Sequence, residues 1–499
     1  MRFKPTPMLL ADFYKVSHRE QYPDKTQKVY ATWTPRGSRL KGVDKVVAFG
    51  FQGFIKDYLM DYFTENFFNI PLNDVIFEYK RIIKNTLLIE NPYTKHIEDL
   101  HKLGYLPIKI TALKEGTLVP LRVPMLTIEN TDDRFFWLTN FLETIMSSML
   151  WMPSTSATIA FEYRKILEKW FKTTGGIKEL IPFTGHDFSM RGMTGMLPAS
   201  ASGAGHLLSF AGTDTIPAIQ YLEAFYNADV EKELVGASVP ATEHSVMCAM
   251  GQDEKSAFKR LITEVYPSGI VSIVSDTWDL WEIIGTILPA LKDEIMARDG
   301  KVVIRPDSGD PVKIICGDKK HTGDTPRDEL IRKGVVQCLY DIFGGTQNKQ
   351  GYIQLDSHIG AIYGDAITRE RCDSICYQLA HYGFTCTNVV FGIGSFTYQY
   401  NTRDTFGFAL KSTHVVIDGE EINIFKDPKT DDGLKKSQKG RVRVYVDAVD
   451  EVACKLAYED NLTIEASKED NLLETVFEDG VLIRNEILSD IRKRLLISI

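Results

Sequence analysis

Four polar residues in the middle of the chain could carry chemistry, because each stands shortly after an apolar run. Arg305 and Asp307 follow one such run, Asp276 follows another, and His244 lies just past a third. A guanidinium offers a planar fork of donors to phosphate or a carbonyl, and an aspartate suits ribose hydroxyls or hydrated Mg²⁺. A histidine held by a carboxylate is a candidate nucleophile or base. The plainer alternatives are a turn-closing ion pair and a structural, hydrogen-bonded histidine.

Two glycine-bearing turns come after later apolar runs, at 364–365 and 392–395. Bare backbone amides at such turns can approach a phosphate closely. Glycine is also common in ordinary turns, so the pattern alone is weak. Arg403, Lys411 and Lys426 supply positive charge farther along the chain. Together with these cations, the turns favour anion binding.

Two aromatic residues are candidates for holding a flat heterocycle. Phe188 stands three residues before Arg191, and Tyr14 lies near the start of the chain. Two aromatic rings can sandwich a planar ligand, whereas packing in the core is the usual role of either one. The sequence leaves both readings open.

The elements that must position these residues follow a regular rhythm. Six apolar runs lie about 25–35 residues apart, with one longer gap, which is typical of parallel βαβ units. In parallel barrels the carboxyl ends of the strands carry the chemistry, so we expect the polar tails to form one site. The six runs are Leu207–Phe210, Ala237–Val239, Ile270–Val274, Val302–Ile304, Ala361–Tyr363 and Val389–Phe391.

A chain of 499 residues exceeds what one hydrophobic core usually covers. The predicted fold class is α/β, an irregular parallel (β/α) barrel plus a β-rich domain built from both chain ends. Short strands are expected at 108–110, 118–124, 415–417, 422–425 and 442–446, and helices within 44–68, at 136–151 and at 158–171. The predicted segments are the N-terminal part of a mixed α+β domain at 1–150, the barrel domain with the active site at 151–395, and a C-terminal β-rich part at 396–499.

Net charge and the distribution of apolar residues argue against some classes of function. A net charge of -9 disfavours nonspecific binding to nucleic acid or anionic membranes. The start of the chain has no long apolar segment, and no stretch is long and apolar enough to span a membrane, so we expect a cytoplasmic protein. The seven cysteines are odd in number. Cys372 and Cys376 could share a helical face, but we expect buried free thiols.

Taken together, these motifs resemble the nicotinamide phosphoribosyltransferase family of type II phosphoribosyltransferases. The resemblance runs over nearly the whole chain, with the motifs in order. The segments that carry it are Ala11–His18, Glu129–Asp132, Phe136–Asn140, His186–Phe188, Gly212–Thr215, Ser238–Ala241, Glu243–Ser245, Val274–Asp276, Arg305–Gly309, Thr402–Asp404 and Phe425–Pro428.

The resemblance implies an activity and its partners. The family makes nicotinamide mononucleotide and pyrophosphate from nicotinamide and phosphoribosyl pyrophosphate, in NAD salvage. ATP is a co-substrate whose hydrolysis is coupled through a phosphorylated histidine, which His244 matches, with Asp276 and Asp307 completing the catalytic group. Mg²⁺ is implied as a cofactor, with no protein ligand identified. A homodimer with shared active sites is also implied.

The resemblance also assigns binding roles. Phe188 and Tyr14 are expected to stack on the pyridine ring, Tyr14 coming from the second subunit, and Asp214 to accept from the carboxamide. Arg191 and Arg305 are expected to line the ring and sugar region. The expected phosphate and ribose ligands are Arg36, Asp307, Gly364, Asp365, Gly394, Ser395, Arg403, Lys411 and Lys426.

Two rival functions stay open at this point. One is a nicotinate phosphoribosyltransferase, and Asp214 argues against it because a carboxylate repels the acid and accepts from the amide. The other is a non-catalytic binding protein, against which the presence of His244 argues. The chain departs from the pattern of the animal members at Ser395, where glycine is usual, at Ala409, which replaces a hydroxyl, and at Ser189–Met190, which replace a Gly-Tyr pair.

Overall fold

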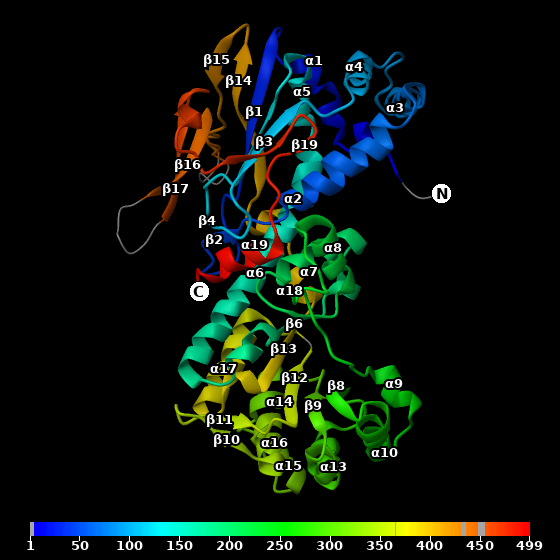
Figure 1. Ribbon diagram of the computed structural model, residues 1–499, viewed down its shortest axis with the longest axis vertical. Helices are drawn as coiled ribbons and strands as arrows, with labels where there is room; N and C mark the ends of the chain where they lie inside the picture. The colour runs from blue at the N-terminus through cyan, green and yellow to red at the C-terminus, as the bar shows by residue number, and fades with distance from the viewer. Residues whose placement is uncertain (1–3, 365, 431–435, 448–454) are drawn as a thin grey trace. The chain divides into compact units, whose positions relative to one another are not determined.

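The computed structural model describes residues 4–364, 366–430, 436–447 and 455–499, and the chain divides into two compact units. The terminal unit comprises residues 1–158, 221–228 and 401–498. The central unit comprises residues 159–220 and 229–400, with residue 499. Figure 1 shows the helices and strands of both.

The terminal unit is built on a seven-stranded antiparallel sheet from both ends of the chain, in the order β15-β14-β1-β5-β3-β18-β19. In Figure 1 the blue β1 lies beside the orange β14. The predicted β-rich domain from both chain ends is therefore confirmed. The strands are β1 (Thr26–Thr34), β3 (Ile108–Ala112), β5 (Leu126–Asn130), β14 (Ala409–Ile417), β15 (Glu420–Asn423), β18 (Glu474–Glu478) and β19 (Val481–Leu482).

Two further strand pairs and several helices complete this unit. The pairs are β2 (Lys45–Val47) with β4 (Leu118–Pro120), and β16 (Arg441–Asp447) with β17 (Lys455–Leu462). The helices are α1 (His18–Gln21), α2 (Phe51–Phe54), α3 (Leu72–Leu87), α4 (Lys95–Leu103), α5 (Trp137–Phe141) and α19 (Leu488–Leu496).

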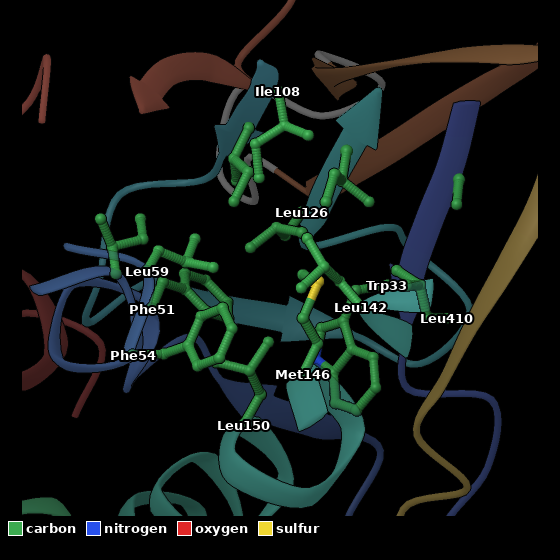
Figure 2. Close-up of a cluster of buried hydrophobic side chains, with 14 of the residues drawn as sticks. Trp33, Phe51, Phe54, Leu59, Ile108, Leu126, Leu142, Met146, Leu150 and Leu410 are labelled. Carbon is green, nitrogen blue, oxygen red and sulfur yellow. The ribbon is translucent and has the colours of Figure 1, made fainter. Parts of the chain in front are cut away.

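A large apolar core holds the terminal unit together. Figure 2 shows part of it, where Trp33 and Leu410 from neighbouring strands meet Phe51, Phe54 and other residues. Trp33 is fully buried. Each fully buried large apolar side chain stabilises the fold by about 1.5–3 kcal/mol. Strands from opposite ends of the chain thus share one core.

Helix prediction at 44–68 and 136–171 was partly wrong. The first segment starts with β2, and α2 then continues as the π-helical turns η3 (Ile55–Tyr62) and η4 (Thr64–Phe68). The second contains the short helix α5 and then the continuous helix α6 (Glu143–Thr174), which runs through the break that was predicted between residues 151 and 158. Pro153 lies inside α6, although proline in a helix interior costs about 3 kcal/mol. The Ser154 hydroxyl donates to Val47 O at 2.5 Å, so tertiary contacts hold the helix there.

The central unit is built on a six-stranded parallel sheet, in the order β7-β6-β13-β12-β9-β8. Residues 237–242 bridge to β7 on one side and to β8 on the other, so they join the two edges of the sheet. The predicted irregular parallel barrel is confirmed. Its strands are β6 (Gly185–Asp187), β7 (Gly212–Thr213), β8 (Ser268–Val274), β9 (Asp299–Arg305), β12 (Ile359–Tyr363) and β13 (Val389–Ile393).

Four of the six predicted runs lie in strands of this sheet, namely those in β8, β9, β12 and β13. The run Ala237–Val239 takes the position of a strand but makes only isolated bridges. The run Leu207–Phe210 was wrongly predicted as a strand. It is the turn after α7 (Met196–His206), held by a bond from Leu207 N to Gly203 O. The short strand β6 was not predicted.

Capped helices follow three strands of the central unit. Asp279 caps α11 (Leu280–Glu282) after β8, Asp310 caps α14 (Pro311–Cys316) after β9, and Thr368 caps α17 (Arg369–His381) after β12. A side-chain acceptor at each helix start satisfies a backbone N–H that the helix leaves unpaired.

The other helices of this unit are short or pack around the sheet. They are α8 (Ile216–Tyr226), which ends in the terminal unit, α9 (His244–Ala249), α10 (Glu254–Arg260), α12 (Leu288–Ala290), α13 (Lys292–Met296), α15 (Pro326–Lys333), α16 (Val335–Phe343) and α18 (Ser395–Tyr398). A small hairpin joins β10 (Gly345–Gln347) to β11 (Ile353–Leu355). In the described part of the chain, no helix is both long and apolar enough to cross a membrane.

Candidate active site

The barrel of the central unit encloses a cavity of about 380 Å³. Its walls are residues of β6, β8, β9, β12 and β13 together with the segment 237–241. At the carboxyl ends of the strands it is lined by His186, Phe188, Asp214 and Arg305, and Lys301 lines it near the start of β9. Three of the predicted nicotinamide-binding residues therefore share one cavity.

Asp214 is fixed on one side only. Its Oδ1 lies 2.8 Å from His186 Nε2 and accepts from the Ser238 hydroxyl at 2.6 Å. These bonds, with the charge of Arg305, hold the pKa of Asp214 below its usual range although burial acts in the opposite direction. The side chain is 44% exposed. An ionised carboxylate thus faces the cavity.

Phe188 packs where two glycines approach it. A Cβ at Gly392 would lie 2.6 Å from Phe188 Cδ2, and one at Gly364 would lie 2.6 Å from Asp307 Oδ1 and 3.5 Å from Phe188 Cε2. A Cβ at Gly392 would also lie 2.7 Å from the Gly364 Cα and does not fit, whereas a Cβ at Gly364 would require the Asp307 side chain to shift. The predicted turn glycine Gly364 therefore brings Phe188 and Asp307 close together.

Arg305 links the cavity to the second polar group. One of its Nη atoms donates to the Thr242 carbonyl oxygen in the bridging segment, and its Nε lies 3.9 Å from Asp307 Oδ1. Arg305 is held by the backbone on one side and faces an acid on the other. It can present donors to a sugar or phosphate.

His244 begins α9 and faces two carboxylates. Its Nε2 lies 3.8 Å from Asp276 Oδ1 and 4.0 Å from Asp307 Oδ2, while its Nδ1 lies 3.1 Å from Thr277 Oγ1. The histidine side chain is 48% exposed. The three residues predicted as catalytic therefore lie together, with the imidazole open to a ligand.

Asp276 is anchored through a single oxygen. Its Oδ2 accepts from Asp307 N at 2.9 Å, Ser308 N at 2.7 Å and the Ser308 hydroxyl at 2.6 Å. Its buried Oδ1 has no hydrogen-bond partner among the described residues. An orphaned buried acceptor of this kind indicates a cation or a donor group that binds beside His244.

The other predicted residues of the central unit lie at its loops. Arg191 is exposed in the short 3₁₀ turn 190–192. Gly394 precedes α18, whose first residue is Ser395, and a Cβ at Gly192 would lie 2.0 Å from Ser395 Oγ. The predicted phosphate ligand Asp365 lies outside the described residues.

Five predicted residues lie in the terminal unit instead. Tyr14 and Arg403 line a second cavity there, of about 240 Å³, together with Glu143. Tyr14 is 56% exposed. Lys411 donates to Glu143 Oε1 at 2.9 Å, so a phosphate at Lys411 would compete with this carboxylate.

The remaining two predicted phosphate ligands of this unit are Arg36 and Lys426. Arg36 donates through Nε to Gly407 O at 2.8 Å. Lys426 has its backbone N–H bonded to the Ser437 hydroxyl at 2.9 Å, and the residue is exposed.

Sequence reasoning assigned no role to four residues that shape these groups. His186 and Ser238 bond Asp214, Thr277 bonds His244, and Ser308 bonds Asp276. Each stands within two residues of a predicted strand end or site residue, which was the available signal. Their partners lie up to 33 residues away, so pairing could not be read locally.

Comparisons with known families and proteins agree over most of the chain. Residues 183–481 match the nicotinate phosphoribosyltransferase (NAPRTase) family, and residues 7–110 match the nicotinamide phosphoribosyltransferase N-terminal domain. A nicotinamide phosphoribosyltransferase of Acinetobacter baylyi is 49% identical, covering 99% of this chain and 98% of the relative. That of Mycoplasma pneumoniae is 35% identical, covering 87% and 94%.

Two solved structures share the fold. A nicotinate-nucleotide pyrophosphorylase from Pyrococcus furiosus gives a TM-score of 0.57 at 15% identity, covering 100% of this chain and 98% of that one. A human nicotinic acid phosphoribosyltransferase gives 0.52 at 15% identity, covering 98% and 93%. On its near full-length match to curated relatives, the chain belongs to the nicotinamide phosphoribosyltransferase family.

Proposed function

We propose that this chain transfers a phosphoribosyl group to nicotinamide, forming nicotinamide mononucleotide and pyrophosphate for NAD synthesis. The observation that carries the proposal is Asp214, an ionised carboxylate that faces the barrel cavity beside Phe188. Relatives that bear the name of this enzyme, one of them 49% identical, support it.

The base-binding step follows from the cavity. The Phe188 ring offers a face to the pyridine, and Asp214 accepts a hydrogen bond from the carboxamide NH₂. Nicotinate would place a second carboxylate against Asp214, and like charges repel strongly in a partly desolvated site. This arrangement favours the amide over the acid.

The transfer step needs positioning more than a strong base. The C1–O bond to pyrophosphate breaks and the C1–N bond to the pyridine nitrogen forms, through a state with positive charge on the sugar. In this proposal Asp307 holds the ribose hydroxyls and Arg305 holds the sugar or phosphate region, as the resemblance implies. Fixed carboxylates also stabilise positive charge that develops nearby.

The residues present fit a loosely held magnesium ion. In the described part of the chain, no group of three or more His, Cys, Asp or Glu side chains could hold a metal by itself. Mg²⁺ commonly uses one or two carboxylates together with substrate phosphates and water. The buried, unpartnered Oδ1 of Asp276 and the neighbouring Asp307 match that requirement. When bound, the ion would neutralise charge on the departing pyrophosphate.

The ATP-coupled part of the proposal rests on His244. Its imidazole nitrogen would attack the terminal phosphorus of ATP, so that an N–P bond forms, a P–O bond breaks and ADP leaves. Asp276 and Asp307 on one side and Thr277 on the other would hold the ring in position. Water would then hydrolyse the phosphohistidine to phosphate.

A homodimer with shared sites is part of the proposal. Tyr14 and Arg403, predicted to reach a nicotinamide and a phosphate, line the exposed cavity of the terminal unit. We propose that this cavity completes the site of a second copy.

The six cysteines of the described residues are free thiols, which supports the predicted cytoplasmic location.

The test measures mononucleotide formed from nicotinamide and from nicotinate by the purified protein, with phosphoribosyl pyrophosphate, Mg²⁺ and ATP. We expect the wild type to prefer nicotinamide, and Asp214→Asn to reduce that preference by about 10–100-fold through loss of the charge. Glu243→Gln, a charge change outside the cavity lining, serves as a control for the preference. A wild type that prefers nicotinate, or an Asp214→Asn variant with unchanged preference, contradicts the proposal.

A further inference from the structure

We propose that His186 and Ser238 are positioning residues that lock one oxygen of Asp214, leaving the other oxygen to read the amide of the substrate. The inference rests on the proposed function. It explains how a partly exposed side chain can be held firmly enough to discriminate between an amide and an acid.

The hydrogen-bond pattern fixes the direction of both bonds. An ionised carboxylate only accepts, so His186 Nε2 and the Ser238 hydroxyl must both be donors to Oδ1 of Asp214. The bonds are 2.8 Å and 2.6 Å long, which is typical of charge-assisted bonds. With Oδ1 taking both donors, Oδ2 is the oxygen left for the substrate.

The imidazole of His186 is itself held tightly. Its side chain is only 11% exposed, and its ring lies 4.7 Å from the ring of Phe188, tilted by 44°. On the side of β7, a Cβ at Gly212 would lie 2.7 Å from His186 Nδ1, so the strand backbone packs closely against the ring. A rigid donor therefore supports both the acid and the aromatic residue that face the pyridine.

Ser238 completes the restraint from a separate element. It lies in the segment 237–242 that joins the sheet edges, 24 residues from Asp214 along the chain. Asp214 follows β7 and His186 lies in β6. Two donors from two different elements prevent the carboxylate from rotating, and rotation would otherwise exchange its free and bonded oxygens.

The consequence for specificity can be stated in kinetic terms. A free carboxylate oxygen at a fixed position rewards the NH₂ of nicotinamide and penalises the carboxylate of nicotinate. If a restraint is removed, Asp214 can turn away, so the amide loses a bond and the acid meets less repulsion. Because the group touches the base rather than the breaking bond, KM for nicotinamide should change more than kcat.

The test compares three variants of the full-length protein with the wild type. His186→Phe keeps an aromatic ring beside Phe188 but removes the donor, Ser238→Ala removes the second donor at an exposed position, and His186→Gln restores a side-chain N–H. We expect His186→Phe to raise KM for nicotinamide about 10-fold, with kcat within about 3-fold, and to reduce amide preference similarly. Ser238→Ala should show about a 3–10-fold effect of the same kind, and His186→Gln should recover part of the loss.

Several results would overturn this inference. One is wild-type KM and preference in both His186→Phe and Ser238→Ala. Another is a fall in kcat with unchanged KM and preference, since that indicates a merely structural role. If His186→Phe does not fold, Ser238→Ala decides alone. Absence of mononucleotide from the wild type overturns the proposed function and this inference with it, whereas a selective wild type with indifferent variants overturns only the inference.

Discussion

The central unit holds two histidine–aspartate groups at the carboxyl ends of its strands, and they differ in how tightly they are held. His186 is almost buried and its Nε2 lies 2.8 Å from Asp214. His244 is about half exposed and lies 3.8 Å and 4.0 Å from Asp276 and Asp307. The first imidazole is hydrogen-bonded directly to its carboxylate, whereas the second lies beyond hydrogen-bond distance of both its carboxylates.

The difference teaches what each group can do. A buried imidazole bonded to a carboxylate has its reactive nitrogen occupied, so it can orient a neighbour but cannot attack phosphorus. An exposed imidazole that no acid bonds directly keeps a nitrogen available to attack phosphorus. The same pair of residue types thus serves selection in one place and chemistry in the other.

Substitution of the open histidine should give the largest effect. We expect His244→Ala to reduce ATP hydrolysis by at least about 100-fold and to leave a slow, ATP-independent transfer, because binding and orientation remain. Steady-state release of ADP and of mononucleotide would be measured in parallel. Cys248→Ser, one turn farther along α9, is the matched control and should behave like the wild type. Full ATP turnover by His244→Ala would remove the chemical half of the comparison.

A third histidine extends the comparison to full burial. His206 lies between the Tyr398 hydroxyl at 2.6 Å and Gly212 O at 3.0 Å, and burial lowers its pKa to about 4, although Asp187 acts in the opposite direction. The unfolded chain takes up this proton near pH 6.5, and the folded chain only near pH 4. Below pH 6.5 the unfolded state therefore binds more protons, and stability falls as pH decreases towards 4.

Thermal denaturation between pH 7 and pH 4 would check this expectation. His206→Gln keeps a polar side chain but does not titrate, so it should flatten the part of the pH dependence that comes from His206. A variant with the same pH dependence as the wild type would show that the buried histidine does not titrate in this window.

A smaller effect should follow if a methyl group is added at Gly364, which lies beside both Asp307 and Phe188. In Gly364→Ala the new methyl would lie 2.6 Å from Asp307 Oδ1, so Asp307 must shift, at a cost of about 1–3 kcal/mol. We expect transfer to slow by about 10–100-fold. Circular dichroism would establish that the variant is folded, and initial rates at saturating nicotinamide would give the loss. Unchanged rates would mean that Asp307 does not need its present position.

Removal of a single restraint on the open group should have the smallest effect. In Ser308→Ala, Asp276 Oδ2 keeps the backbone donors of Asp307 and Ser308, so ATP hydrolysis should fall only about 2–5-fold. The matched comparison is Ser238→Ala in the tight group, where one of two donors is lost and base preference changes. A large loss in Ser308→Ala would show that the open group is as tightly specified as the closed one.

Much of the fold could be predicted from local pattern. The apolar runs of β8, β9, β12 and β13 are short and flanked by polar turns, a pattern that is typical of buried strands. The run Leu207–Phe210 is also short and apolar, but it forms the turn that ends helix α7. The helix α6 passes through Pro153 because tertiary contacts outweigh the local penalty.

The chain by itself determined which side chains follow the strands, and therefore that acids, a histidine and an arginine gather at one end of a parallel sheet. Only the tertiary structure decided which oxygen of Asp214 is bonded and that His244 is left open. The physical reason is that the pattern of a strand lies in residues adjacent along the chain, whereas these side-chain hydrogen bonds depend on how distant segments pack together. The bonds that separate the two groups join residues 24 to 33 positions apart, beyond the range of any local pattern.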